Sequence, residues 1–304
     1  MLTATLLLPA SDRLEGLALP PALGRALARA DHSQLAAGEP AQLARHVQSV
    51  PAAATCPVAA LTRQLDAGDA GTSRWLRADP CFVAADMQGV RMLAHGPALA
   101  LTAEEAAGFA AELAPVFAEH GLVFSAPEPS RWYLKLPVGM DIPELVAVDT
   151  VLGDDLFEHL PVGEQGRLWR SLLSDTQMLL HQMPLNAARH GAGKAMVNSL
   201  WFWGAGVLPE RVSCAYGQVR SPDPLLQALA AQAAKGDPQR QLVDLRHLRD
   251  GQAMIDQALV PLLEALGRGE LSQLELDFAD GQSWRFERGQ RWRFWRGTRK
   301  TLQR

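Results

Sequence analysis

The chain has 304 residues, 48% of them hydrophobic, so it can bury one large core or two ordinary ones. Its formal net charge of −4 gives no overall attraction to nucleic acid or to an anionic membrane. The three cysteines, Cys56, Cys81 and Cys214, form no Cys-x-x-Cys pair. This disfavours a thiolate metal site and is typical of a reducing compartment.

The N-terminal part predicts a buried strand followed by short helices. Residues 2–9 contain three consecutive leucines and no basic leader, which indicates a strand rather than a signal peptide. No later segment approaches the roughly 20 apolar residues that a membrane span needs. We therefore expect a cytoplasmic protein without a membrane partner. Residues 19–60 predict short helices with loops, and the loop at 66–73 indicates a domain boundary near residue 72.

The middle of the chain predicts a small α/β unit. Residues 75–91 carry apolar side chains at strand-like intervals. Thr102, followed by two glutamates, predicts the start of a helix that Gly121 ends. Two further strands are expected at 122–125 and 132–136, which complete a strand–helix–strand arrangement.

The later elements alternate between helix and strand. Residues 164–183 predict a helix that Pro184 ends, and VNSLWFWGAG at 197–206 predicts a core strand that leads into a glycine-rich loop. Two helices are expected at 225–234 and 251–266. The glycine-separated segments near the C-terminus predict a three-stranded antiparallel meander, formed by residues 274–278, 283–287 and 292–296.

Metal-binding patterns are weak in this sequence. The eight histidines form no HExxH motif, and only His247 lies beyond residue 190. Asp244, His247 and Asp250 could share one side of a helix as a partial metal site, but a solvated or helix-capping cluster is the favoured interpretation. We therefore predict no metal and no cofactor.

The segment HQMPLNAAR at 181–189 is a candidate ligand site, although the common nucleotide and hydrolase motifs are absent. Asn186 and Arg189 lie where a helix breaks, and Arg189 could pair with a carboxylate or phosphate. Capping of the helix by the same two residues is an equal alternative. Lys194 and Asn198 would join either network.

Two other arginine-rich segments each allow two interpretations. Arg77 could bind an anion or form a buried network with Asp79, and the structural role is favoured. The basic aromatic tail at 288–304 could bind single-stranded nucleic acid, which would be salt-sensitive and lost on truncation. A meander strand with one aromatic face explains the same letters, so we do not favour nucleic acid as a partner.

The chain resembles the RpfE-type regulatory proteins over most of its length. The resemblance is carried by WLRADP at 75–80, RWYLKLP at 131–137, the segments at 147–163 and 168–189, and VNSLWFWGAGVLP at 197–209. It implies a role in regulation, and with it a protein partner.

In the order of these segments the chain also resembles the archaeal-type cofactor-independent phosphoglycerate mutases. In those enzymes an Asn-x-x-Arg segment is followed by a strand that ends in Trp-x-Trp-Gly-x-Gly. The resemblance implies an alkaline-phosphatase-like three-layer α/β core with an inserted α/β cap. The core would comprise residues 1–72 and 190–304, and the cap residues 73–189.

The departures from the mutases bear on activity. Those enzymes depend on two divalent ions held by aspartates and histidines, and this chain lacks recognisable counterparts. The resemblance therefore implies a noncatalytic regulatory protein whose pocket binds a small phosphorylated or carboxylate metabolite. The predicted ligand residues are Arg77, Asn186, Arg189, Lys194 and Asn198. The alternative is an active mutase or phosphatase with relocated ligands, first among them Asp12, Asp244 and His247.

Overall fold

The computed structural model describes residues 2–50, 55–87 and 89–302. The chain divides into two compact units, unit 1 of Met1–Ala52 with Glu210–Arg304 and unit 2 of Ala53–Pro209. Both contain helices and sheets, so the expected mixed α/β class is confirmed. Each unit is described by itself.

Unit 1 is built on a six-stranded sheet with the order β10-β11-β1-β12-β13-β2. Four neighbouring strands are parallel: β10 (Tyr216–Arg220), β11 (Asp237–Asp244), β1 (Leu2–Leu8) and β12 (Leu271–Phe278). The last two are antiparallel, β13 (Gln282–Glu287) and β2 (Asp31–Gln34). The N-terminal strand β1 is therefore paired on both sides with strands from the C-terminal part of the chain.

Strand β1 lies at the centre of this sheet because both of its faces are apolar. Leu6 and Leu8 belong to one hydrophobic cluster with Leu276 of β12, while Leu7 points to the opposite face and is also fully buried. A strand buried on both sides has a continuous hydrophobic run, as residues 6–8 do. The predicted N-terminal strand is confirmed.

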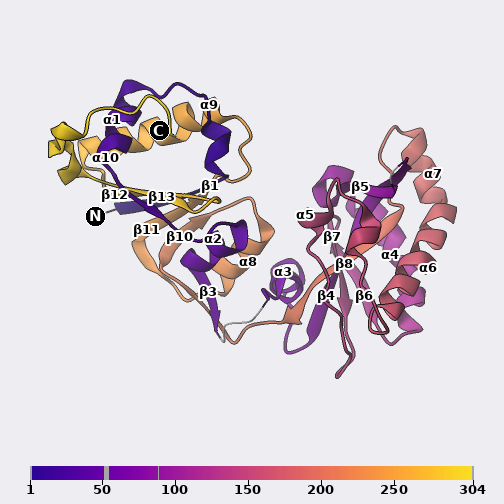
Figure 1. Ribbon diagram of the computed structural model, residues 1–304. Helices are drawn as coiled ribbons and strands as arrows, with labels where there is room; N and C mark the ends of the chain where they lie inside the picture. The colour runs from indigo at the N-terminus through magenta and orange to yellow at the C-terminus, as the bar shows by residue number, and fades with distance from the viewer. Residues whose placement is uncertain (1, 51–54, 88, 303–304) are drawn as a thin grey trace. The chain divides into compact units, whose positions relative to one another are not determined.

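Helices cover both faces of this sheet (Figure 1). One face carries α1 (Pro21–Arg29) and the stretch formed by α9 (Gly251–Met254), a π-helical turn (Ile255–Leu259) and α10 (Val260–Arg268). The other face carries α2 (Glu39–His46) and α8 (Pro224–Gln232). Below them, β3 (Val47–Val50) and β9 (Arg211–Cys214) form a separate antiparallel pair. The helices expected at 225–234 and 251–266 are confirmed, the second with a π-helical interruption.

The predicted third strand of the meander is wrong. Residues 292–296 are not extended, because the chain after β13 forms the short 3-10 helices η5 (Arg288–Trp292) and η6 (Phe294–Arg296). The free edge of β13 is taken by β2, which contributes the third antiparallel strand. Trp292, Phe294 and Trp295 are consequently exposed by 65 to 74% instead of packing on the sheet. The last two residues of the predicted basic tail, Gln303 and Arg304, lie outside the described part.

Unit 2 is built on an antiparallel five-stranded sheet organised by the long strand β4 (Arg74–Asp86). Its partners are β5 (Gly89–His95), β7 (Arg131–Lys135) and β8 (Ser199–Val207), and β6 (Val123–Glu128) pairs with β7. The strands expected from residues 75–91, 122–125, 132–136 and 197–206 are confirmed. The glycine-rich loop expected at the end of the last one does not form, because Gly204 and Gly206 lie within β8.

The helices of unit 2 pack on this sheet through one large apolar cluster. Helix α4 (Ala103–Ala118) begins with the predicted cap, since Thr102 and Glu105 form a reciprocal capping box. Helix α6 (Arg167–Gln182) ends before Pro184, with which α7 (Pro184–Gly191) begins. Phe109, Trp169 and Phe202 are among the buried residues that these helices and β8 share. A smaller cluster with Trp75 and Tyr133 attaches α3 (Val58–Ala67) to the sheet. Short elements complete the chain: η1 (Ser11–Leu14), η2 (Gly96–Leu99), α5 (Val148–Val151) and η3 (Leu156–His159).

The limits of the two units differ from the expected boundaries near residues 72 and 190. Helix α3 packs on the sheet of unit 2, and β8 pairs along β4, so both segments belong to unit 2. Residues 19–50 also contain the two short strands β2 and β3, which their polar sequences do not signal. Over residues 2–50, 55–87 and 89–302, no helix combines the length and apolar character needed to cross a bilayer.

Candidate functional site

Asn186 and Arg189, the centre of the predicted ligand site, are buried in α7 and tie the following loop to the helix. The amide nitrogen of Asn186 donates to the carbonyls of Leu180 and Val197, both at 2.7 Å, and its oxygen accepts from the backbone N–H of Val197 at 2.9 Å. Arg189, 1% exposed, donates to the carbonyls of Leu99 and Ala195 at 2.6 and 2.8 Å. These contacts join the loop after α7 to the helix, and we call this arrangement the staple.

A glutamate that the sequence marks only as a helix cap completes this network. Glu105 of α4 accepts from Arg189 at 2.7 Å, and Lys194 lies 3.4 Å from its other oxygen. Burial would raise the pKa of Glu105, but the Thr102 backbone N–H and the Arg189 charge outweigh it and lower the pKa below its ordinary value. Glu105 therefore holds two of the predicted ligand residues together.

Asn198 and Arg77 use their polar groups in other places of the same unit. Asn198 accepts from the backbone N–H of Val83 at 2.8 Å and donates to its carbonyl at 2.7 Å. Arg77 is buried in β4 and forms two hydrogen bonds to Asp79, at 2.8 and 2.9 Å. Trp203 donates to the same carboxylate at 2.7 Å. The predicted buried Arg77–Asp79 network is confirmed. The structure thus brings Asn186, Arg189 and Lys194 together, while Asn198 and Arg77 serve separate strand contacts.

The predicted partial metal site at residues 244–250 does not converge. Asp244 is buried, His247 is exposed, and Asp250 caps α9 by accepting from two backbone N–H groups. Asp12, the third candidate of the relocated ligand set, is exposed in η1. Within residues 2–50, 55–87 and 89–302, no group of three or more His, Cys, Asp or Glu side chains is arranged to hold a metal ion.

The carboxyl edge of the unit 1 sheet is the place where an α/β sheet normally binds its ligand. Two buried aspartates lie there, Asp244 at the end of β11 and Asp277 in β12, and both are register partners of Leu7 in β1. Register partners in parallel strands point to the same face, so both carboxylates face α2 and α8. Their Cα atoms are separated by two strand spacings, or about 10 Å.

Asp244 is neutralised by Arg246, two residues further along the chain. The guanidinium donates to both carboxylate oxygens, at 2.9 and 2.7 Å, and Ser221 donates its hydroxyl at 2.6 Å. Burial would raise the pKa of Asp244, but the hydrogen bonds from Arg246 and Ser221 outweigh it, so the pKa is lowered. Arg246 also binds Asp223, the cap of α8, at 2.8 Å. This pair therefore anchors α8 to the edge of the sheet.

Asp277 is bound by two consecutive residues of α2, the arginine Arg45 and the histidine His46. Arg45 donates to both oxygens, at 2.9 and 2.6 Å, and His46 lies 2.6 Å from one of them. The other ring nitrogen of His46 lies 2.8 Å from the Tyr216 hydroxyl. Burial would raise the pKa of Asp277, but His46 and Arg45 outweigh it and the pKa is lowered. The carboxylates of this edge thus already have cations as partners.

This arrangement does not fit two divalent ions. A hard cation at either carboxylate would have to displace a guanidinium that is bound through two hydrogen bonds. The edge can hold charge in fixed places and join α2 and α8 to the sheet. Neither Asp244 nor Asp277 is free to take a metal. Sequence analysis missed Asp277, Arg45 and His46, although an aspartate near the end of an apolar strand (LELDF) is a signal that could have found the first.

Comparison with curated proteins gives partial matches to one enzyme class. A segment of 63 residues is 35% identical to a probable 2,3-bisphosphoglycerate-independent phosphoglycerate mutase of Geobacter sulfurreducens. This segment makes up 21% of this chain and 16% of that protein. Sixty residues are 32% identical to the 2,3-bisphosphoglycerate-independent phosphoglycerate mutase of Methanosarcina mazei, covering 20% of this chain and 15% of that protein. The chain therefore has a distant and local similarity to these mutases, and no family model matches it.

Comparison with solved structures gives long but loose superpositions. A cofactor-independent phosphoglycerate mutase from Thermoplasma acidophilum superposes with a TM-score of 0.41 and 14% identity, over 95% of this chain and 90% of that one. A protein from Pyrococcus horikoshii superposes with a TM-score of 0.49 and 9% identity, over 94% and 87%. Neither superposition by itself establishes a common fold.

The staple role of Arg189 predicts a large difference between two neighbouring variants. Arg189→Gln should lower the free energy of unfolding by about 3 kcal/mol, because it leaves Glu105 without its buried partner. Lys194→Gln, whose side chain is 42% exposed, should cost less than about 1 kcal/mol. Urea unfolding followed by circular dichroism measures both. Equal effects would contradict the staple role.

The neutralised edge predicts a loss of stability in acid. Because the pKa of Asp277 is lowered on folding, its contribution is full above the unfolded-state pKa of about 4 and disappears as the pH falls through the folded-state pKa. Asp277→Asn should therefore cost about 3 kcal/mol at pH 7 and less with each step of pH below about 4. The exposed Asp12→Asn variant is the control. Denaturant unfolding between pH 7 and pH 3 measures the difference, and a cost for Asp277→Asn that does not change with pH would refute it.

Proposed function

We propose that this chain is a noncatalytic binding protein with a regulatory role, built on a scaffold related to the phosphoglycerate mutases. The local identity of 32 to 35% to such mutases supports the relationship. The five ordered segments that resemble the RpfE-type proteins support the regulatory part. An alkaline-phosphatase-like core, with the cap formed by the inserted segment, is part of the same proposal.

The observation that carries the proposal is the neutralised carboxyl edge of unit 1. Phosphoryl transfer needs cations that stabilise the charge developing on the transferred group and that activate a nucleophile. Here Asp244 is paired with Arg246, and Asp277 is paired with Arg45 and hydrogen-bonded to His46, so neither carboxylate is free to hold such an ion. The guanidinium groups carry positive charge, but the carboxylates already neutralise it. Unlike a metal ion, a guanidinium group also cannot lower the pKa of a bound water.

The proposed ligand is a small phosphorylated or carboxylate metabolite. Binding through Arg77, Asn186, Arg189, Lys194 and Asn198 stays a prediction. An anion there would compete with Glu105 for Arg189 and with Asp79 for Arg77. A regulatory protein partner is likewise a proposal, which rests on the RpfE-type resemblance.

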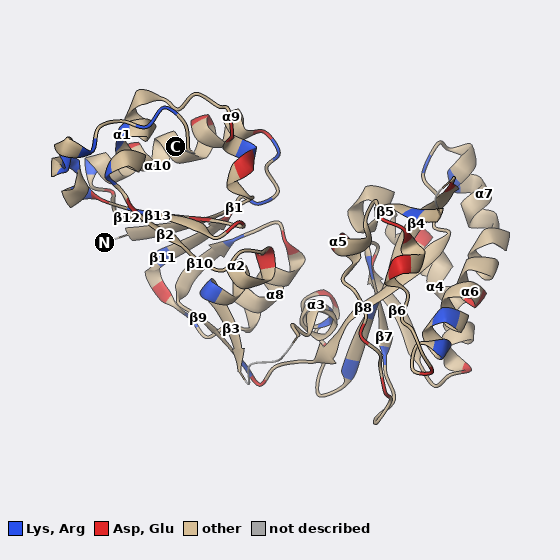
Figure 2. Ribbon diagram, viewed as in Figure 1, with Lys and Arg blue, Asp and Glu red and all other residues tan. Residues whose placement is uncertain are grey.

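A second candidate function is favoured by the exposed C-terminal aromatics. The strand that would have explained the tail without a partner does not form, and Trp292, Phe294 and Trp295 project among arginines. Figure 2 shows basic residues gathered along η5 and η6. Exposed aromatic rings beside guanidinium groups are the elements of a single-stranded nucleic-acid surface. Nucleic-acid binding by the tail should weaken steeply as the salt concentration rises, and this dependence distinguishes it from the first function.

The proposal predicts no phosphoglycerate mutase turnover. Purified protein incubated with 3-phosphoglycerate and Mn²⁺ or Mg²⁺ should form 2-phosphoglycerate no faster than buffer does, because both edge aspartates are paired. The same protein should show a cooperative thermal transition, which controls for folding. Metal-dependent turnover that disappears in Asp12→Ala, Asp244→Ala or His247→Ala would instead establish the relocated-ligand enzyme.

A further inference from the structure

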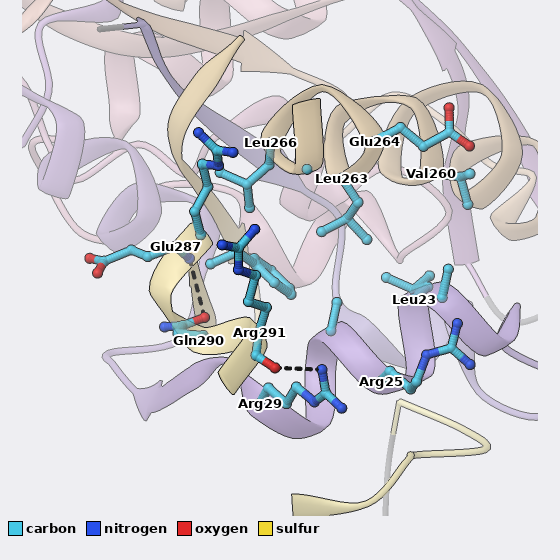
Figure 3. Close-up of a pocket in the computed structure, with 15 residues that line it drawn as sticks. Leu23, Arg25, Arg29, Val260, Leu263, Glu264, Leu266, Glu287, Gln290 and Arg291 are labelled. Carbon is cyan, nitrogen blue, oxygen red and sulfur yellow. Dashed lines mark hydrogen bonds between the residues drawn. The ribbon is translucent and has the colours of Figure 1, made fainter. Parts of the chain in front are cut away.

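Unit 1 contains a cavity of about 320 Å³ on the face of the sheet that carries α1 and α10. Its floor is apolar and includes Leu23 of α1, Leu263 and Leu266 of α10, and Phe286 of β13 (Figure 3). The segment η5 closes one side with Gln290 and Arg291. The cavity lies within the size range of small-molecule sites, and such sites combine an apolar lining with a few polar groups.

Four arginines line this cavity, namely Arg25, Arg29, Arg288 and Arg291. In the described part of the chain, none of the four is joined to a carboxylate by an ion pair, whereas the buried arginines Arg77 and Arg189 are. The two glutamates of the lining have other partners. Glu264 lies 3.7 Å from Arg268, and the side chain of Glu287 accepts the backbone N–H of Gln290 as the cap of η5. The arginines therefore retain donors for another anion.

Among the residues that the structure describes, one nitrogen of Arg29 is a hydrogen-bond donor without a partner. Its terminal nitrogen donates to the Arg291 carbonyl at 2.9 Å, which links α1 to η5. Its Nε–H is buried and has no hydrogen-bond partner within the described residues. A buried donor without a partner costs about 1 to 3 kcal/mol, so Arg29 would be stabilised by any small shift that brought this N–H to an acceptor.

We propose that this cavity binds an amphipathic anion, with the apolar part against Leu23, Leu263 and Phe286 and the carboxylate or phosphate head at Arg29 and Arg291. The apolar floor accounts for the tail, and the unpaired guanidinium groups account for the head. The chain as a whole carries a charge of −4, so this concentration of arginines is local. The proposal assigns a ligand of this class to a cavity of unit 1 that is distinct from the predicted ligand residues of unit 2, and it rests on the proposed binding function.

The first test compares ligands that share a tail or a head. Isothermal titration calorimetry with octanoate and octyl phosphate should show saturable binding of one ligand per chain, and the tighter of the two identifies the head as carboxylate or phosphate. Octanol, acetate and inorganic phosphate should bind at least about 10-fold more weakly, because each lacks one half of the interaction. Octanol binding as tight as octanoate, or no saturable binding of either amphiphile, would overturn the proposal.

The second test locates the site with variants. Arg29→Gln and Arg291→Gln should each weaken binding about 10-fold through loss of a charge-assisted hydrogen bond. Leu263→Trp should abolish binding by filling the cavity. Arg249→Gln, an exposed arginine of unit 1 outside the lining, is the control and should bind as the parent does. Arg291 is exposed, so its variant should fold even if Leu263→Trp does not.

Unchanged affinity in Arg29→Gln and Arg291→Gln would remove the cavity as the site. The result is separable from the proposed function, because absence of mutase turnover together with absence of amphiphile binding would refute only this inference. Turnover with metal, together with amphiphile binding that depends on Arg29 and Arg291, would refute the noncatalytic function and support the site.

Discussion

The structure of unit 1 depends on how it neutralises two carboxylates at one edge of its sheet. Asp244 and Asp277 flank the central strand at Leu7, are buried, and have lowered pKa values because arginine and histidine side chains outweigh the cost of burial. The same contacts attach α2 and α8 to the sheet. This edge of the sheet is therefore joined to its helices by an internal ion-pair network.

Much of the fold could be predicted from local signals. Thr102 and Glu105 mark the start of α4 through a capping box, and the leucines at 6–8 mark a strand buried on two faces. The failure at residues 292–296 has a specific cause. The aromatic residues and arginines of this segment resemble a strand sequence, but the edge beside β13 is filled by Asp31–Gln34, whose polar sequence gives no such signal. Pairing between segments this far apart is not encoded in either segment alone.

The candidate sites were less predictable, because their partners are distant in sequence. The break before α7 drew attention to Asn186 and Arg189, but Glu105, the carboxylate that binds Arg189, lies 84 residues away in the sequence. Asp277 and Arg45 are separated by 232 residues. Single residues with suitable chemistry can be found in a sequence, whereas their state of pairing is a property of the fold. That the arginines of the unit 1 cavity have no carboxylate partner among the described residues could be seen only in the structure.

The measurement that tests the central claim most directly is the divalent metal content of the purified protein. The protein would be incubated with manganese, magnesium and zinc, freed of loosely bound ions, and analysed by elemental mass spectrometry. The account predicts far less than one ion per chain, because Arg45 and Arg246 already neutralise Asp277 and Asp244. Near two tightly held ions per chain would contradict it and restore a metal-dependent phosphotransfer enzyme.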